Sequence, residues 1–255
     1  MKVVFLGAGN LATRLSLEMQ QKGIRVSQVY SRTESNADRL AKRLACDWTA
    51  MLEEVETDAD LYIFSLKDTA LAEVIRRVRP NKGLWVHTAG SMPMEVFKGY
   101  TEHYGVLYPL QTFSKERPVD FQVIPFFLEA NTPENERKLQ QVAEMLSKDV
   151  RFLSSEKRKS LHLAAVFACN FTNHMYVLAA KLLQEQGVSS EVLLPLIDET
   201  AAKIHAMSPN QAQTGAAIRF DENVINKHLA MLDDPAMRSI YQLISQNIHK
   251  EAQHE

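Results

Sequence analysis

Short apolar runs alternate with segments of helical spacing from the start of the chain to about residue 153. The runs are rich in Val, Ile, Phe and Tyr, residue types that favour strands. We expect strands at Lys2–Leu6, Arg25–Tyr30, Leu61–Ser65, Leu84–His87, Gly105–Tyr108, Pro125–Glu129 and Val150–Leu153. This alternation predicts an α/β fold in which crossover helices join the strands of a parallel sheet.

Two of the segments between the runs carry clear marks of helices. Apolar residues between positions 37 and 44 recur at the i, i+3, i+4, i+7 spacing of a helix that packs one face on a sheet. The segment "NTPENERKLQQVAEML" predicts another helix, because Thr132 can cap its start and Pro133 suits its first position.

The β-rich runs end near residue 154, and the rest of the pattern predicts helices separated by "EQGVSSE", "MSPNQAQTG" and "LDDPAM". We therefore expect a parallel-sheet domain at residues 1–153 and an all-helical domain at residues 154–255. No flexible linker separates the two patterns, so we expect the domains to pack tightly.

One apolar stretch, from Leu161 to Leu183, is long enough to cross a membrane. It contains two histidines and two asparagines, which would be costly at bilayer depth, and no aromatic belt or charge asymmetry frames it. We expect a helix buried inside a soluble protein, with no membrane partner.

Apolar residues also crowd around Pro195. Val192, Leu193, Leu196 and Ile197 exceed what one helix face needs. They fit either a dimer contact or a core helix that is buried on several sides.

Composition narrows the classes of partner. A net charge of −2, with Lys and Arg spread along 255 residues, gives no basic stripe for a phosphate backbone, so we expect no nucleic-acid partner.

Cys46 and Cys169 lie far apart and predict buried thiols in a reducing compartment. The first apolar run is too short for a signal peptide, and we expect a cytoplasmic protein. The eight histidines show no HExxH or comparable spacing, so we expect no metal.

The first strand leads directly into "GAGNLA", a GxGxxA pattern between a predicted strand and a predicted helix. Gly7 allows a tight turn, Gly9 lets the backbone approach a pyrophosphate, and Ala12 permits the helix to pack closely on the strand. The free N–H groups of the helix start then hold the phosphate charge. This context predicts a dinucleotide site in a Rossmann-type domain.

The second strand is followed by Ser31, Arg32 and Thr33. Sites for NAD and FAD usually have Asp or Glu here for the ribose hydroxyls, whereas an acid would repel the 2′-phosphate of NADP. A guanidinium and two hydroxyls can instead bind that phosphate. Arg32 therefore predicts NADP, and the alternative is a surface arginine that happens to follow a strand.

Seven segments occur in a characteristic order: "FLGAGNLA", "YSRTESNADRLAKRL", "ADLYIFSLKDTALAEVI", "HTAGSMPMEVF", "GVLYPLQTF", "LHLAAVFACNFTNHM" and "TGAAIRFDENVINKHLAML". Together they resemble the Rossmann-like proteins with a C-terminal domain of unknown function 2520, relatives of pyrroline-5-carboxylate reductase and the β-hydroxyacid dehydrogenases. The resemblance spans nearly the whole chain. It implies an NADP oxidoreductase of unsettled reaction, a helical domain that helps to build a homodimer, and a substrate cleft between the two domains.

The resemblance also places Leu66, Lys67 and the turn Thr88–Gly90 along the cofactor, with the turn near the nicotinamide ring. Both stretches follow predicted strands, and ligands of open α/β sheets collect at the carboxyl ends of the strands. Lys67 fits a plain solvated lysine equally well. The full set of predicted cofactor residues is Gly7, Gly9, Asn10, Leu11, Ser31, Arg32, Thr33, Leu66, Lys67, Thr88, Ala89 and Gly90.

The chain departs from the family pattern near the expected cleft. It has Tyr108-Pro109 where the family often has His-Pro, and Leu161-His162 where the family often has Tyr-His. It also reads "TGA" in place of Thr-Gly-Pro and "RFD" in place of Arg-Gly-Asp. These differences leave the substrate open.

The apolar helix offers groups for proton transfer. On an ideal helix His162, Asn170 and Asn173 fall within about 80° of one another and form a polar stripe. These side chains could either form hydrogen bonds with a neighbouring helix or contact a substrate. The corresponding helix of β-hydroxyacid dehydrogenases has a proton-donating Lys four residues before an Asn, where this chain has Val166.

Hydride transfer to a carbonyl or imine needs an acid, and histidine is the side chain that suits neutral pH. We nominate His162 as the acid and Asn170 as its orienting group. Arg219 would suit a substrate carboxylate or an interface ion pair. The weaker substrate candidates are Gln111, Thr112, Asn173, Arg219 and His228.

Two functions are consistent with these patterns. The first is an NADP(H)-dependent oxidoreductase that transfers hydride to a small carbonyl or imine compound and forms a homodimer through its helical domain. The second is a non-catalytic NADP-binding redox sensor or assembly protein, which the missing lysine and the altered cleft motifs would favour.

Overall fold

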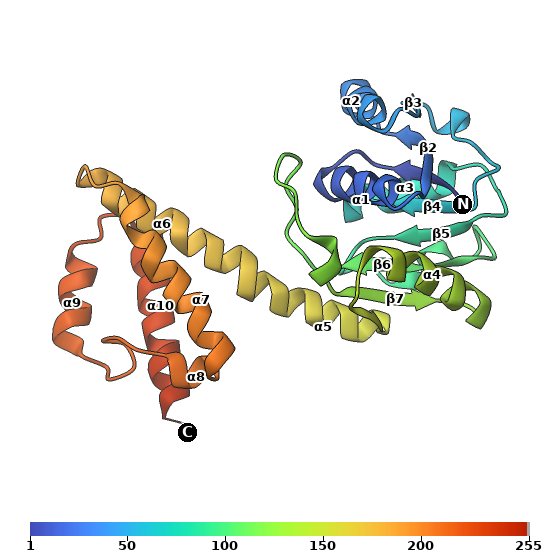
Figure 1. The fold of residues 1–255 in the computed structure, drawn as a ribbon. Helices are drawn as coiled ribbons and strands as arrows, with labels where there is room; N and C mark the ends of the chain where they lie inside the picture. The colour runs from blue at the N-terminus through green and yellow to red at the C-terminus, as the bar shows by residue number, and fades with distance from the viewer. Residues whose placement is uncertain (254–255) are drawn as a thin grey trace. The chain divides into compact units, whose positions relative to one another are not determined.

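The computed structural model describes residues 1–253 and contains an eight-stranded sheet followed by a helical region (Figure 1). The strands are β1 (Lys2–Leu6), β2 (Arg25–Tyr30), β3 (Asp47–Thr49), β4 (Leu61–Phe64), β5 (Leu84–His87), β6 (Tyr104–Pro109), β7 (Phe126–Ala130) and β8 (Val150–Phe152). The helices that accompany them are α1 (Asn10–Gln21), α2 (Glu34–Leu44), α3 (Asp68–Arg77) and α4 (Pro133–Leu146). The later helices are α5 (Ser155–Ala165), α6 (Thr172–Glu185), α7 (Leu194–Ala206), α8 (Pro209–Ala212), α9 (Glu222–Ala230) and α10 (Pro235–Ala252).

The strand order is β3-β2-β1-β4-β5-β6-β7-β8, which confirms the expected α/β class with a Rossmann-type start and a helical end. Every pairing is parallel except β6 with β7, which is antiparallel. The sheet departs from the expected parallel arrangement at this one pair. A loop with the short 3-10 helix Phe121–Val123 joins β6 to β7, and no crossover helix carries the chain back to the other end of the sheet.

Local sequence explains the helices that cover the sheet. The four apolar residues that set the spacing between positions 37 and 44 are all buried in α2, as predicted. Thr132 caps α4, because its side chain accepts a hydrogen bond from the Asn135 N–H at 3.2 Å, and Pro133 is the first helical residue. The short edge strand β3 has no matching prediction, because "DWT" lacks a run of apolar residues.

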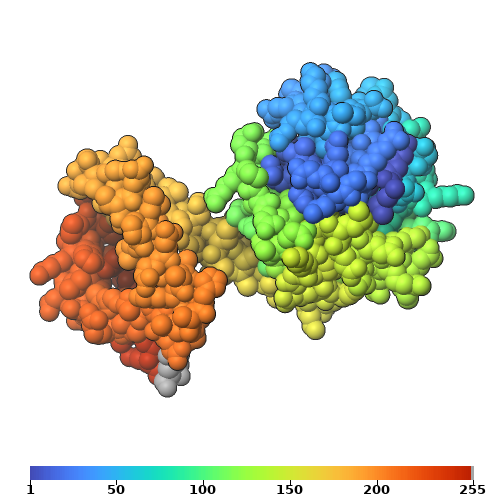
Figure 2. Space-filling model, viewed as in Figure 1, coloured from blue at the N-terminus to red at the C-terminus, as the bar shows by residue number. Residues whose placement is uncertain are grey.

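The core lies on both faces of the sheet, because successive residues of a strand point to opposite sides. Val3 and Phe5 of β1 pack in one cluster with residues of α1, α2 and α4, whereas Val4 and Leu6 pack in another with residues of α3. On the face seen in Figure 2, side chains fill the spaces between the ribbons of this part of the chain. The first loop therefore starts from a strand that is rigidly held.

The start of α5 is tied to the sheet by a buried ion pair. Arg158 is fully buried, and its Nη1 lies 2.5 Å from Oε2 of Glu129 in β7. Its Nη2 donates to the carbonyl oxygen of Met92 at 2.6 Å. The last strand ends at Phe152, but α5 belongs to the same compact unit as the sheet, which extends to Asn170.

The second unit starts at Phe171, and few of its described side chains are buried, namely Ile225, Leu232, Met237 and Ser245. The expected buried helix runs from Ser155 to Glu185, and none of its most apolar window is buried. The expected burial of this helix is therefore not seen in residues 1–253. By length and composition alone the helix could cross a membrane, which for a single helix is weak evidence.

Candidate functional site

Five neighbouring strands, β2, β1, β4, β5 and β6, run parallel, so their carboxyl ends meet at one edge of the sheet. The loops that leave this edge begin at Gly7, Ser31, Ser65, Thr88 and Leu110. All predicted cofactor residues lie in the first four of these loops or in the helix starts that follow them. Ligands of open α/β sheets collect at such an edge.

Gly7 makes the first turn with a backbone conformation that favours glycine. Its φ is +125°, and a Cβ atom placed on it would lie 2.1 Å from the carbonyl oxygen of Ser65. The Gly7 N–H donates to the carbonyl oxygen of Tyr30 at 2.8 Å. The loop is therefore clamped between the ends of β2 and β4.

Gly9 leaves an open space at the start of α1. No atom lies within 4 Å of a Cβ atom placed on it, and no side chain caps the first turn of the helix. Ala12 is fully buried where the helix approaches the strand. The Asn10 side chain points to another loop, donating from Nδ2 to the carbonyl oxygen of Phe113 at 2.9 Å. Uncapped N–H groups beside open space fit a pyrophosphate.

The loop after β2 presents polar groups to solvent. Arg32 and Thr33 are exposed, Ser31 is half-buried, and Ser31 Oγ accepts a hydrogen bond from the Thr33 N–H at 3.3 Å. Thr33 is the residue that precedes α2, and its side chain does not cap the helix. The arginine and the helix start together fit the 2′-phosphate of NADP.

His87 shapes the turn expected beside the nicotinamide ring. Its Nδ1 accepts a hydrogen bond from the Ala89 N–H at 3.2 Å, so the ring hydrogen of the neutral side chain is on Nε2. Nε2 then donates to the carbonyl oxygen of Pro93 at 3.3 Å. Burial lowers the pKa of His87 to about 3, and the positive charge of Arg158 adds to the effect. The side chain therefore stays neutral, and its two hydrogen bonds hold Ala89 in the turn and Pro93 just beyond it.

His162 lies against the same turn. A Cβ atom placed on Gly90 would lie 2.6 Å from His162 Cγ and Nδ1, so the imidazole packs directly on the glycine backbone. The Tyr108 hydroxyl lies 3.0 Å from His162 Nδ1. Tyr108 is buried, which raises its pKa above the ordinary value, although the charge of Arg158 opposes this shift. The turn, a histidine and a tyrosine thus converge beside the carboxyl ends of β5 and β6.

Tyr108 is a site residue that sequence reasoning does not select. Its position at the carboxyl end of a strand, in a dipeptide that departs from the family pattern, is the signal that could have found it. Its partner His162 is among the predicted residues, but the hydrogen bond between the two depends on the placement of α5.

The nominated orienting residue Asn170 lies eight residues after His162 on the same long helix. Asn170 itself belongs to a π-helical turn, Val166–Phe171, which interrupts the α-helical repeat after His162. Asn170 is exposed at the end of the first unit. The angle of about 80° that an ideal α-helix predicts does not apply across this turn, and the role of Asn170 stays a prediction.

The remaining candidates occupy separate places. Gln111 and Thr112 are exposed after β6, and Lys67 is exposed at the start of α3. Asn173, Arg219 and His228 are exposed in the second unit, where His228 Nδ1 lies 2.8 Å from the Tyr241 hydroxyl. In residues 1–253 no group of three or more His, Cys, Asp or Glu residues could hold a metal ion.

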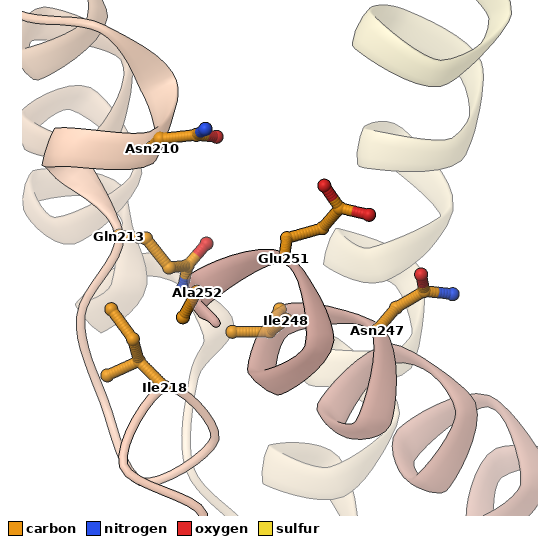
Figure 3. A pocket seen from close by; sticks show the side chains of 7 residues that line it. All are labelled: Asn210, Gln213, Ile218, Asn247, Ile248, Glu251 and Ala252. Atoms are coloured by element: carbon orange, nitrogen blue, oxygen red, sulfur yellow. The ribbon is translucent and has the colours of Figure 1, made fainter. Parts of the chain in front are cut away.

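The second unit contains a small pocket of about 210 Å³ between α8 and α10 (Figure 3). Its lining residues are Asn210, Gln213, Ile218, Asn247, Ile248, Glu251 and Ala252. None of them is a predicted site residue. The pocket holds no convergent titratable groups of the kind found beside Gly90.

A glycine-rich first loop, a free helix start and a parallel-strand edge define a dinucleotide-binding α/β protein. Residues 2–86 match the family model described as NADP oxidoreductase, coenzyme F420-dependent, and residues 124–248 match the domain of unknown function 2520. A protein from Bacteroides fragilis, provisionally described as an NADP oxidoreductase, is 55% identical over 98% of each chain with a TM-score of 0.94. The chain therefore belongs to this family of NADP oxidoreductases, and the expectation of NADP is confirmed at the level of the family.

Two solved structures of lower identity share the fold. A protein from Thermotoga maritima is 23% identical, covers 98% of this chain and 99% of its own, and has a TM-score of 0.80. A reductive aminase from Aspergillus terreus, solved with NADPH and ethyl levulinate, is 16% identical, covers 98% and 94%, and has a TM-score of 0.73. A search of curated proteins found no match.

We expect substitution of the two loop glycines to affect different properties, stability at Gly7 and NADPH binding at Gly9. We expect Gly7→Ala to cost about 2–4 kcal/mol in the free energy of unfolding, because of its positive φ and the contact with Ser65. Gly9→Ala should cost about 1 kcal/mol or less, yet weaken NADPH binding about tenfold or more, because the methyl group enters the phosphate space. Urea unfolding and fluorescence titration measure the two effects. A Gly9→Ala variant that binds NADPH like the parent would contradict the phosphate assignment.

Because His87 is buried and neutral, we expect the folded protein to lose stability in mild acid. The unfolded chain protonates this side chain at the ordinary pKa of about 6.5, whereas the folded protein does so only at about 3. Between these values the unfolded state binds more protons, so stability falls as the pH drops below 6.5. From pH 6.5 to pH 5 we expect the parent to lose about 2 kcal/mol more than His87→Gln in urea unfolding. The exposed control His205→Gln should follow the parent, and equal slopes for all three proteins would rule out this role of His87.

Proposed function

We propose that this protein is an NADP(H)-dependent oxidoreductase of the cytoplasm that transfers hydride to a small molecule with a C=O or C=N bond. The observation that carries the proposal is His162, packed on Gly90 and hydrogen-bonded to Tyr108 at the carboxyl edge of the sheet. The NADPH complex of a reductive aminase with the same fold supports the substrate class. Both cysteines are free, in keeping with a reducing compartment.

The residues at the edge fit the cofactor from end to end. The Gly7 loop and the start of α1 would hold the pyrophosphate, Arg32 the 2′-phosphate, and the turn Thr88–Gly90 the nicotinamide ring. When bound, NADPH supplies the hydride. The protein must then supply a proton and keep the acceptor in place.

Negative charge develops on the carbonyl oxygen or imine nitrogen as hydride arrives, so a proton donor must lie beside the nicotinamide. Because Nδ1 of His162 is engaged by Tyr108, Nε2 is the nitrogen left to face a substrate. The Tyr108 hydroxyl accepts from Nδ1 when that nitrogen carries a hydrogen, as it does before and after a charged imidazole gives up its Nε2 proton, and donates to Nδ1 in the other neutral tautomer. The raised pKa of Tyr108 keeps this hydroxyl protonated at neutral pH.

Labelled cofactor tests the reaction directly. NADPH deuterated at either face of C4 is incubated with a panel of keto acids, aldehydes and cyclic imines, and the products are analysed by mass spectrometry. We expect deuterium transfer from one face only, and we expect His162→Gln to lower kcat about 10²-fold or more with NADPH affinity unchanged. The exposed control His205→Gln should keep full activity. Tight NADPH binding without transfer to any compound would contradict the proposal and favour a redox sensor.

The proposal includes a homodimer formed through the helical unit. Large apolar side chains are exposed there, among them Val192, Leu194 and Leu196 beside Pro195. So many exposed apolar residues in a unit with so small a core indicate a surface that another molecule covers. A second copy is the partner that is always present with the chain, and it would cover the apolar helix without a membrane.

Sedimentation in buffer without detergent tests the dimer. We expect twice the chain mass at micromolar concentration, and the single-chain mass for the double variant Val192→Glu, Leu196→Glu, because buried charge opposes association. Val123 is an equally exposed apolar residue of the sheet unit, so Val123→Glu serves as the matched control and should remain dimeric. A monomeric parent, or a parent that stays in solution only with detergent, would contradict the proposal.

A further inference from the structure

The segment that joins β6 to β7 crosses the carboxyl edge of the sheet to the starts of α1 and α2. The carbonyl oxygen of Phe113 accepts from Asn10 Nδ2 at 2.9 Å, and Lys115 Nζ donates to Asn36 Oδ1 at 3.4 Å. Figure 1 shows this segment in green beside α1, and in Figure 2 its atoms border the blue N-terminal residues. A lysine distant in sequence from the first two loops therefore lies at the first turn of α2.

Aromatic contacts hold the segment in this position. The rings of Phe113 and Phe121 lie 5.8 Å apart, and Phe113 packs against the main core cluster. Lys115 is half-buried, whereas the neighbouring Arg117 is exposed. The lysine is thus held at the helix start, while the arginine beside it projects into solvent.

Positive charge gathers around the first turn of α2. Asn36 Oδ1 accepts from Arg39 Nη2 at 2.8 Å as well as from Lys115, and α2 begins two residues after Arg32. Within residues 1–253 none of these three cations forms an ion pair with a carboxylate. The nearby Asp38 is paired with Lys42 at 2.8 Å. Glu34 also lies in this turn, but it is exposed and forms no ion pair with any of the three cations. The cluster therefore carries net positive charge and suits a doubly charged anion.

We propose that Lys115 binds the 2′-phosphate of NADP together with Arg32 and so contributes to the choice of NADP over NAD. The inference rests on the cofactor assignment of the proposed function. The hydrogen bond from Lys115 to the neutral Asn36 amide is long, so exchanging that amide for a phosphate oxygen costs little. The flexible stem of a lysine lets Nζ act as a point charge beside the planar guanidinium of Arg32. The segment 110–125 thereby becomes part of the nucleotide site.

The test compares NADPH and NADH in fluorescence titrations of the parent, Lys115→Gln and Arg117→Gln. Lys115→Gln should raise the Kd for NADPH about tenfold and leave the Kd for NADH within about twofold. Arg117→Gln removes the same charge from the same segment, so it serves as the matched control and should leave the ratio of the two Kd values unchanged. Lys115→Arg should recover most of the preference, because it restores the charge.

Two results would overturn the role of Lys115. Either NADPH and NADH weaken equally in Lys115→Gln, as expected if the lysine only holds the loop, or NADPH binding is unchanged. The titration needs no substrate, so it tests the role of Lys115 separately from the proposed reaction. If the parent shows no reductase activity but Lys115→Gln loses the preference for NADPH, only the proposed reaction is contradicted. A parent that binds both nucleotides equally would overturn the NADP assignment and the role of Lys115 with it.

Discussion

The buried ion pair between Arg158 and Glu129 is the interaction on which the rest of the site depends. It joins the first turns of α5 to β7, and its second guanidinium nitrogen holds Met92 in the stretch that follows the turn after β5. His162 lies four residues further along α5, on the same face of the helix, and so it meets Gly90 and Tyr108. Loss of one partner from such a pair costs about 3–5 kcal/mol, because a charge is left buried and unpaired.

The same cation also sets the electrostatics around the turn. Its charge helps to keep His87 neutral and opposes the rise in the pKa of Tyr108 that burial causes. One side chain therefore fixes the position of α5 and influences two groups that line or shape the candidate site. This coupling explains why a helix that follows the last strand belongs to the sheet unit.

The parts predictable from sequence are those that short patterns encode. The Gly7 loop, Arg32 after β2 and the capped start of α4 each need only a few neighbouring residues, and the structure places them as expected. An apolar run has no direction, so the antiparallel course of β7 could not be predicted. The contact between Tyr108 and His162 depends on a distant ion pair, and the π turn that contains Asn170 leaves no mark in hydrophobic spacing. The spacing of apolar residues likewise shows which of them share a helix face, but not what covers that face in the helical unit.

A crystal structure of the protein with NADPH tests the central claim most directly, because the claim concerns where each end of the cofactor lies. We expect the 2′-phosphate beside Arg32 and the nicotinamide ring on the turn Thr88–Gly90, with its C4 atom facing His162. A nucleotide bound away from the carboxyl edge, or a nicotinamide ring turned away from His162, would contradict it.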